Sequence, residues 1–177
     1  MLFKRSRTLT SVVALTVVGF SQHSLANPVT CSEKYNQYVQ AQVKWQQESA
    51  AKAVQLLPEH TDRIHLYRDV QLTAIERRKL AVDIALDKYP DQVATWGSIN
   101  RWIELSPEFE AELAKISPEF QKLTEKYQQQ ISQPASENDA DFSQKFRRTV
   151  TADADFMQLM DDFNVKSREL NNLACQK

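Results

Sequence analysis

The sequence predicts an all-α protein, an up-down four-helix-type bundle with a kinked third helical region, closed by a disulfide between its ends. Apolar residues recur at helical spacing along most of the chain, and no stretch shows the period of two that marks a strand. The prolines beyond residue 30 fall between helical stretches, where they can end or begin a helix. The two cysteines, Cys31 and Cys175, lie near the two ends of the predicted mature chain.

The first helix is expected from Cys31 or Ser32 to Leu57, before Pro58. Thr30 and Glu33 have the spacing of a capping box, in which a hydroxyl and a carboxylate satisfy free amides at a helix start. One broad half of this helix is apolar and is therefore expected to face the core. Its members are Tyr35, Tyr38, Val39, Val43, Trp45, Ala50, Ala53, Val54 and Leu57.

The second helix is expected from about Thr61 to Tyr89, where Pro90 ends it. Thr73 and Glu76 repeat the capping-box spacing, which allows a break near Leu72. Two apolar stripes indicate contacts on two sides of the helix. One stripe holds Ile64, Tyr67, Ala74, Ile75, Val82, Ala85, Leu86 and Tyr89, and the other holds Leu66, Leu80 and Ile84.

The third region, residues 91–131, is interrupted. Its first part suits a short helix containing Gly97. Next, Ser106-Pro107-Glu108-Phe109 recurs eleven residues later as Ser117-Pro118-Glu119-Phe120, and each copy has the Ser cap, early Pro and acidic first turn of a helix start. Proline inside a helix costs about 3 kcal/mol, so we expect a kink or a new start at Pro118. The apolar residues of the short helix are Val93, Trp96, Ile99, Trp102 and Ile103.

A polar loop, residues 132–138 around Pro134, precedes the last region. Asp139-Ala140-Asp141-Phe142 recurs fourteen residues later as Asp153-Ala154-Asp155-Phe156, and both copies fit helix starts with acidic first turns. Neither copy has the glycine and glutamate that a calcium loop needs. The last helix carries a narrow apolar face of Phe156, Leu159, Met160, Phe163, Ser167, Leu170 and Ala174.

Four helical regions make a four-helix bundle the economical assembly. An even number of antiparallel helices brings the first and last ends together, as an intramolecular Cys31–Cys175 disulfide requires. Two separate thiols or a link between chains are the alternatives. In the chain-entropy account, closing so long a loop is worth roughly 5 kcal/mol.

Residues 1–26 have the three-part pattern of a cleaved secretory signal. Lys4, Arg5 and Arg7 precede the uncharged run Thr8–Phe20, and Ser24-Leu25-Ala26 offers a cleavage site. That run is shorter than the roughly 20 apolar residues of a membrane-spanning helix. We therefore expect one helical domain over 27–177, periplasmic or secreted, with no integral membrane segment after cleavage.

The expected mature chain has a net charge of −4, which gives no broad footprint for nucleic acid. His60 and His65 are five residues apart rather than the four of helical zinc sites, so no metal site is predicted. The sequence has no Cys-x-x-Cys-His and no Gly-x-Ser-x-Gly. No cofactor and no catalytic residue are predicted, and an enzymatic role is not favoured.

The candidate binding residues are polar side chains on apolar helix faces. Gln42 and Gln46 share the apolar half of the first helix, and Arg68, Gln71 and Arg78 fall among the apolar residues of the second. An inward guanidinium needs a carboxylate or a ligand, because an unpaired buried charge is costly. These residues therefore indicate a small anion-binding site. The alternative is that the arginine stems cover the edge of the face while their heads reach solvent or pair with acidic residues.

Two functions remain at this point. The first is an exported protein-binding module, such as an inhibitor, an immunity-type protein or a chaperone, whose partner is another extracytoplasmic protein. The second is a small helical-bundle enzyme or sensor that binds an anionic metabolite. An exposed Trp45, Trp96 or Trp102 would mark a protein contact patch. The sequence does not indicate the oligomeric state.

Overall fold

The computed structural model describes residues 29–132 and 139–176. The predicted signal, 1–26, and most of the predicted polar loop lie outside the described residues. Within the described part every regular element is helical, so the all-α prediction is confirmed. The α-helices are α1 (Cys31–Leu56), α2 (Thr61–Lys88), α3 (Pro107–Ile116), α4 (Pro118–Ile131), α5 (Asp139–Ala152) and α6 (Ala154–Asn172). Single turns of 3₁₀ helix are η1 (Pro58–His60), η2 (Pro90–Gln92) and η3 (Ile99–Arg101).

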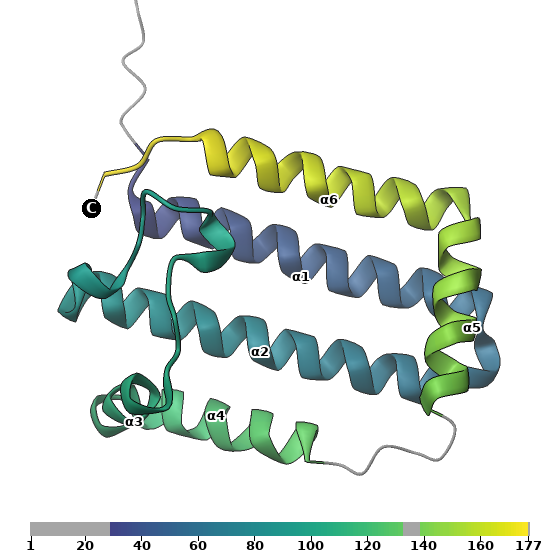
Figure 1. Ribbon diagram of the computed structural model, residues 1–177, viewed down its shortest axis with the longest axis horizontal. Coiled ribbons are helices and arrows are strands. Elements are labelled where there is room, and N and C mark those ends of the chain that lie inside the picture. The colour runs from purple at the N-terminus through teal and green to yellow at the C-terminus, as the bar shows by residue number, and fades with distance from the viewer. Residues whose placement is uncertain (1–28, 133–138, 177) are drawn as a thin grey trace, which may run out of the picture.

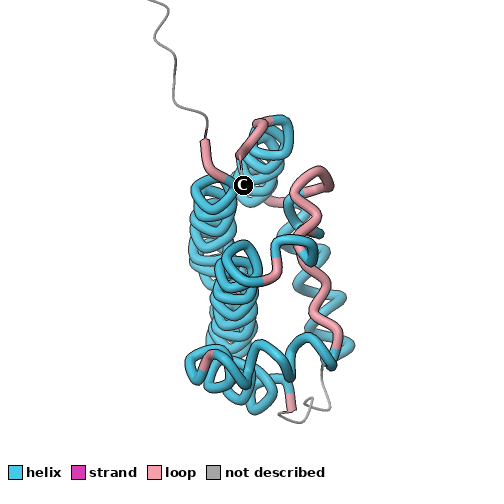
Figure 2. Tube along the Cα trace, turned by 90° about the vertical axis from the view of Figure 1, so that its left-hand side faces the viewer, coloured by secondary structure: helices cyan, strands magenta, loops and turns pink. Residues whose placement is uncertain are grey.

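Four helices form a row in the order α6, α1, α2, α4 (Figure 1). Neighbours in this row run in opposite directions, so the predicted up-down alternation is confirmed. The helices α4 and α6 are the outer members. Segment 93–106 and α5 lie on one side of the row (Figure 2) and cover its two ends. The row is thus covered by a loop at one end and by a crossing helix at the other.

Four of the predicted helix caps are confirmed. Ser106, Ser117 and Asp153 each accept a hydrogen bond from the backbone N–H three residues on, and Thr30 with Glu33 forms the capping box. The third region is broken at Pro118 into α3 and α4. The break allowed near Leu72 is absent, because α2 runs on through a buried Thr73.

Segment 93–106 corrects one prediction, because the short helix around Gly97 does not form. The backbone turns back on itself there, with the Ala94 N–H donating to the Trp102 carbonyl oxygen at 2.8 Å. Trp102 is 1% exposed and stacks on Tyr35 with ring centroids 5.5 Å apart, whereas Trp96 is 80% exposed. Val93, Ile99, Trp102 and Ile103 are buried in one core cluster by this non-helical path. Burial therefore overrides the helical pattern.

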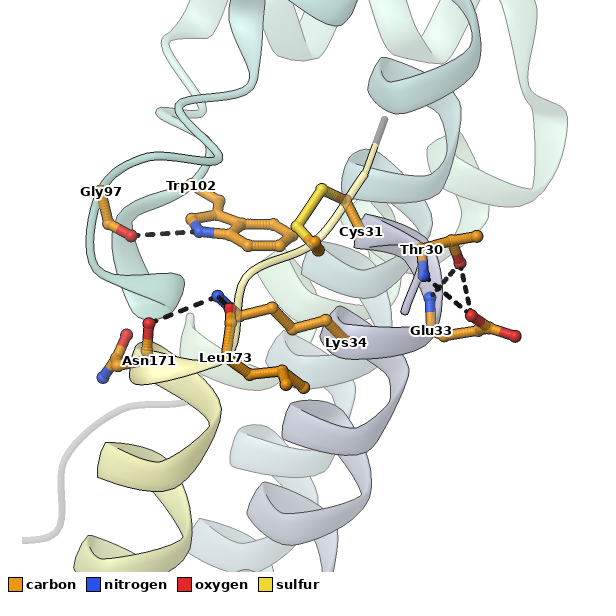
Figure 3. Close-up of a disulfide and its surroundings, with 9 residues drawn as sticks. Thr30, Cys31, Glu33, Lys34, Gly97, Trp102, Asn171 and Leu173 are labelled. Atoms are coloured by element: carbon orange, nitrogen blue, oxygen red, sulfur yellow. Dashed lines mark hydrogen bonds between the residues drawn. A yellow bond between two sulfur atoms is a disulfide. The ribbon is translucent and has the colours of Figure 1, made fainter. Parts of the chain in front are cut away.

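The two ends of the chain are tied together, as predicted. Cys31 and Cys175 form a disulfide with their Cα atoms 4.9 Å apart, across a sequence separation of 144 (Figure 3). The backbone reinforces this tie: the Cys31 N–H donates to the Gln176 oxygen at 2.8 Å, and the Gln176 N–H donates to the Val29 oxygen at 3.0 Å. We call this region the terminal knot.

The core consists of two clusters at opposite ends of the α1–α2 pair. The first lies under segment 93–106, beside the terminal knot, and includes Tyr35, Val82 and Trp102. The second lies under α5 and includes Phe142 and Phe156. The stretch of α1 and α2 between the clusters is less completely covered, and it forms the floor of the site described next.

Candidate functional site

The five residues singled out from the sequence line one groove along α1 and α2, which we call the α1–α2 groove. It consists of two hollows that share Gln71. One, of about 460 Å³, lies between α1, α2 and α5, and its lining includes Gln46 and Arg68. The other, of about 390 Å³, reaches Asn100 and α4, and its lining includes Gln42 and Arg78. Gln71 and Tyr67 are exposed, so the groove is open to solvent.

The helical repeat explains why these side chains share a face. Positions three or four apart lie above one another on an α-helix. On α1 the groove is lined by Gln42, Gln46, Ser49 and Ala53, and on α2 by Ile64, Arg68, Gln71, Ile75 and Arg78. Because α1 and α2 are antiparallel neighbours, the two stripes form the two walls of one groove.

The hollow beside α5 has an apolar floor and basic sides. Tyr67 and Phe142 stack with ring centroids 5.9 Å apart, and Phe146 and Val150 continue the apolar surface. Arg68 and Arg147 also line it, and none of its described lining residues is acidic. Arg147 is a site residue that the sequence did not reveal, because nothing in the sequence shows that α5 crosses α1 and α2.

Arg78 carries a charge that no described carboxylate balances. Its guanidinium donates to the Asn100 carbonyl oxygen at 2.9 Å, and no described acidic side chain lies within 4.0 Å of it. Burial raises the pKa of the nearby Tyr35 and Tyr38 phenols. Both phenols therefore stay neutral at physiological pH. A guanidinium has five N–H donors, so one neutral carbonyl leaves most of its bonding capacity available.

Arg68 is only partly satisfied. Its guanidinium contacts the Asp69 carboxylate, with N–O distances of 2.8 and 2.9 Å. Asp69 is exposed, and pairs of this kind contribute about 0–1 kcal/mol. The alternative reading of the two arginines is met at Arg68, where the head pairs with a neighbouring acid. At Arg78 no described carboxylate pairs with the head, which lies in the open groove.

Among the described arginines, Arg77 is the most buried, and it was not predicted from the sequence. Its Nε donates to the Thr124 hydroxyl at 3.1 Å, it binds the Glu110 carboxylate, and it lies over the Tyr127 ring at 5.3 Å. These partners come from α3 and α4. The helix pattern of α2 shows that two sides are covered, but it does not show which neighbour covers each side. Arg77 therefore joins α2 to α4.

Lys34 is a second buried cation that the sequence analysis missed. Its Nζ donates to the Leu173 carbonyl oxygen at 2.7 Å and lies 5.2 Å from the centre of the Trp102 ring (Figure 3). Burial lowers its pKa. The carbonyls at the end of α6 carry the negative end of the helix dipole, which suits a cation. Its spacing from Cys31 and Tyr38 was the available signal, because all three fall on one face.

The hollow between α1 and α6 does not share the charge pattern of the groove. This hollow, of about 500 Å³, has Trp45 and Phe163 in its floor, but its rim carries Lys44, Glu48, Asp162 and Lys166, so its charges balance. No described group of three His, Cys, Asp or Glu side chains is placed to hold a metal ion. Among the described helices, none has the length and apolar content to cross a membrane.

The α1–α2 groove therefore offers arginine, amide and hydroxyl groups above an apolar floor, a combination suited to recognition of an anionic, partly apolar ligand. Phosphates and carboxylates are both anions that arginine binds with two parallel hydrogen bonds. Comparison with protein-family models, with curated proteins and with solved structures gave no match for this chain.

Proposed function

We propose that this protein is an exported binding module whose α1–α2 groove receives an acidic segment of another extracytoplasmic protein. One observation carries the proposal. None of the described residues that line the groove is acidic, and two of its arginines, Arg78 and Arg147, pair with no described carboxylate. The other two are already paired, Arg77 with Glu110 and Arg68 with the exposed Asp69. The whole chain has 23 acidic and 22 basic residues, so this separation of charge is local. It favours a negatively charged partner.

The form of the groove favours a polypeptide over a metabolite. Sites for small molecules usually enclose most of the ligand surface, whereas this groove is open along Tyr67 and Gln71. Tyrosine and arginine are enriched where proteins meet, because they combine apolar contact with hydrogen bonding. A metabolite-binding sensor or enzyme is the second candidate, and the hollow beside α5 is its best support.

Two features support export. The first 26 residues follow the pattern of a secretory signal, and a Cys31–Cys175 disulfide suits an oxidising compartment. The proposed compartment is the periplasm or the exterior. Mass spectrometry of the native protein tests this part: we expect a chain that starts at Asn27 and is two hydrogens lighter than the reduced form.

The binding proposal is tested with the disulfide-bonded chain 27–177 and a fluorescent twelve-residue peptide of Glu, Leu and Tyr. We expect saturable binding that weakens with salt, and none by a peptide in which Lys replaces Glu. Arg68→Leu with Arg78→Leu should weaken binding at least tenfold, which corresponds to about 1.4 kcal/mol. The matched control is Lys44→Leu with Lys166→Leu, which removes the same charge from the α1–α6 hollow and should leave affinity unchanged.

Equal loss in the two double variants would contradict the proposal, because the effect would then come from net charge alone. Binding of the Lys peptide as tightly as the Glu peptide would contradict it as well. Saturable binding of a small polyanion such as citrate, without peptide binding, would favour the metabolite-binding candidate instead.

A further inference from the structure

We infer that the α1–α2 groove binds an extended peptide with two carboxylates four or five residues apart, the one bound by Arg68 lying beside a large apolar side chain. This inference rests on the proposed function and specifies the partner. It follows from the difference between the two hollows, the distance between the arginines and the side chains placed between them.

The two hollows differ in polarity. The one beside α5 combines the apolar surfaces of Tyr67, Phe142 and Phe146 with Arg68 and Arg147. It suits an apolar side chain with a carboxylate next to it. The hollow towards Asn100 is lined by a larger share of polar groups, and Arg78 is its unbalanced cation. It suits a second carboxylate that has no apolar neighbour.

The spacing comes from helix geometry. Arg68 and Arg78 are ten residues apart on α2, and each helical residue rises 1.5 Å, so their backbones are about 15 Å apart along the axis. An extended chain covers roughly 3.3 Å per residue. Two carboxylates that engage both arginines are therefore four or five residues apart in an extended peptide.

The side chains between the arginines favour an extended backbone. Gln42, Gln46 and Gln71 line this part of the groove, and a primary amide both donates and accepts hydrogen bonds. An extended peptide has free N–H and C=O groups to pair with these amides, whereas a helix has already paired its own. A helix is also about 10–12 Å across, and the two hollows are bounded by residues of α5 and by Asn100 of segment 93–106.

The experiment is a competition series against the twelve-residue peptide described above. Each competitor carries one Leu-Glu pair and a second Glu in a Ser-Thr background. The two Glu residues are two, four, five or eight positions apart, and each spacing is made with the second Glu before the pair and with it after the pair. We expect spacings of four and five to bind at least tenfold more tightly than two and eight. Lys44→Leu with Lys166→Leu serves again as the control for net charge.

Double-mutant cycles then assign each carboxylate. Replacing the Glu of the Leu-Glu pair by Gln should cost at least fivefold in the wild type and almost nothing in Arg68→Leu. Replacing the second Glu should behave in the same way with Arg78→Leu. Tyr67→Ala, at an exposed position, should remove most of the preference for Leu over Ala at the first position of the Leu-Glu pair. Circular dichroism shows that each variant is folded.

The possible failures are distinguishable. If every acidic peptide competes equally whatever its spacing, this inference is wrong while the proposed acidic partner stands. If the couplings are exchanged or absent, the assignment of the two arginines is wrong. If no acidic peptide binds, including the twelve-residue probe, both the inference and the proposed function fall.

Discussion

The terminal knot and the α1–α2 groove use cations in opposite ways. In the knot, Lys34 is 3% exposed and is held by the carbonyls at the end of α6 and by the Trp102 ring. In the groove, Arg78 is half-buried and has one neutral carbonyl as its hydrogen-bond partner. A cation whose hydrogen-bond donors are paired inside the fold, here called saturated, contributes to structure. A cation with free donors beside a surface without acidic residues is available to a ligand.

Arg77 and Arg78 repeat this contrast within two adjacent residues. Arg77 points towards α4 and is saturated by Glu110, Thr124 and two aromatic rings. Arg78, turned by about 100° around α2, lines the groove. Adjacent residues of the same type thus have different roles because different neighbours cover the two sides of their helix. The following predictions test this distinction.

One of the two largest effects is expected at the terminal knot. Replacing both Cys31 and Cys175 by alanine should lower the free energy of unfolding by about 3–5 kcal/mol, because a native disulfide that closes a long loop restricts the unfolded chain. Urea denaturation measures this loss. A reductant should destabilise the wild type to a similar extent and leave the double variant unchanged. If the double variant is as stable as the wild type, the knot does not hold the fold together.

The two tryptophans of segment 93–106 should differ sharply in how much stability is lost when each is replaced by alanine. Trp102→Ala leaves a cavity beside Tyr35 and should cost about 3–5 kcal/mol. Trp96→Ala changes an exposed side chain of the same type and should alter stability by less than about 1 kcal/mol. Urea denaturation of both variants measures the difference. Similar losses in the two would mean that segment 93–106 is not anchored through Trp102.

Substitution of the two adjacent arginines should change the free energy of unfolding by different amounts. Arg77→Leu leaves the Glu110 carboxylate without its partner, and we expect a loss of about 3 kcal/mol. Arg78→Leu should change stability by less than about 1 kcal/mol and should affect peptide binding instead. Adding Glu110→Leu to Arg77→Leu should recover part of the stability. Equal losses in the two single variants would remove the distinction between structural and binding arginines.

The smallest effect concerns acid sensitivity at the start of α6. The Phe156 N–H bond and Lys52 lower the pKa of the Asp153 carboxyl from its ordinary value of 3.8. A lowered folded-state pKa contributes stability that is present above about 3.8 and is lost as pH falls through the folded-state pKa. The wild type should therefore be more stable than Asp153→Asn at neutral pH, and the difference should shrink below pH 4. Thermal unfolding from pH 7 to 2.5 measures it, and a constant difference would contradict the prediction.

The helices were predictable to the extent that their signals are local. Ser106, Ser117 and Asp153 mark helix starts because a cap bonds to an amide three residues away. Segment 93–106 was mispredicted because the position of Trp102 depends on Tyr35, far away in the sequence. A helix-like pattern of apolar residues records that they are buried, but several backbone paths can bury them.

The site was predictable in part for a similar reason. Arg68 and Arg78 were found because polar residues interrupt an apolar stripe, a pattern confined to one helix. Arg147 was not found, because it reaches the groove through the crossing of α5 over α1 and α2. The same pattern gave no means of telling the saturated Arg77 from the available Arg78, since their partners lie on other elements.

By itself, the sequence determined the helical class, most helix ends and the polar stripes of α1 and α2, and it predicted the disulfide between Cys31 and Cys175. Only the tertiary structure decided the order of the helices, the path of segment 93–106 and which cations are saturated. Caps and periodicity act over three or four residues, so they can be recognised from the sequence alone. Saturation of a charge depends on which distant groups packing brings beside it, and that depends on the energy of the whole fold.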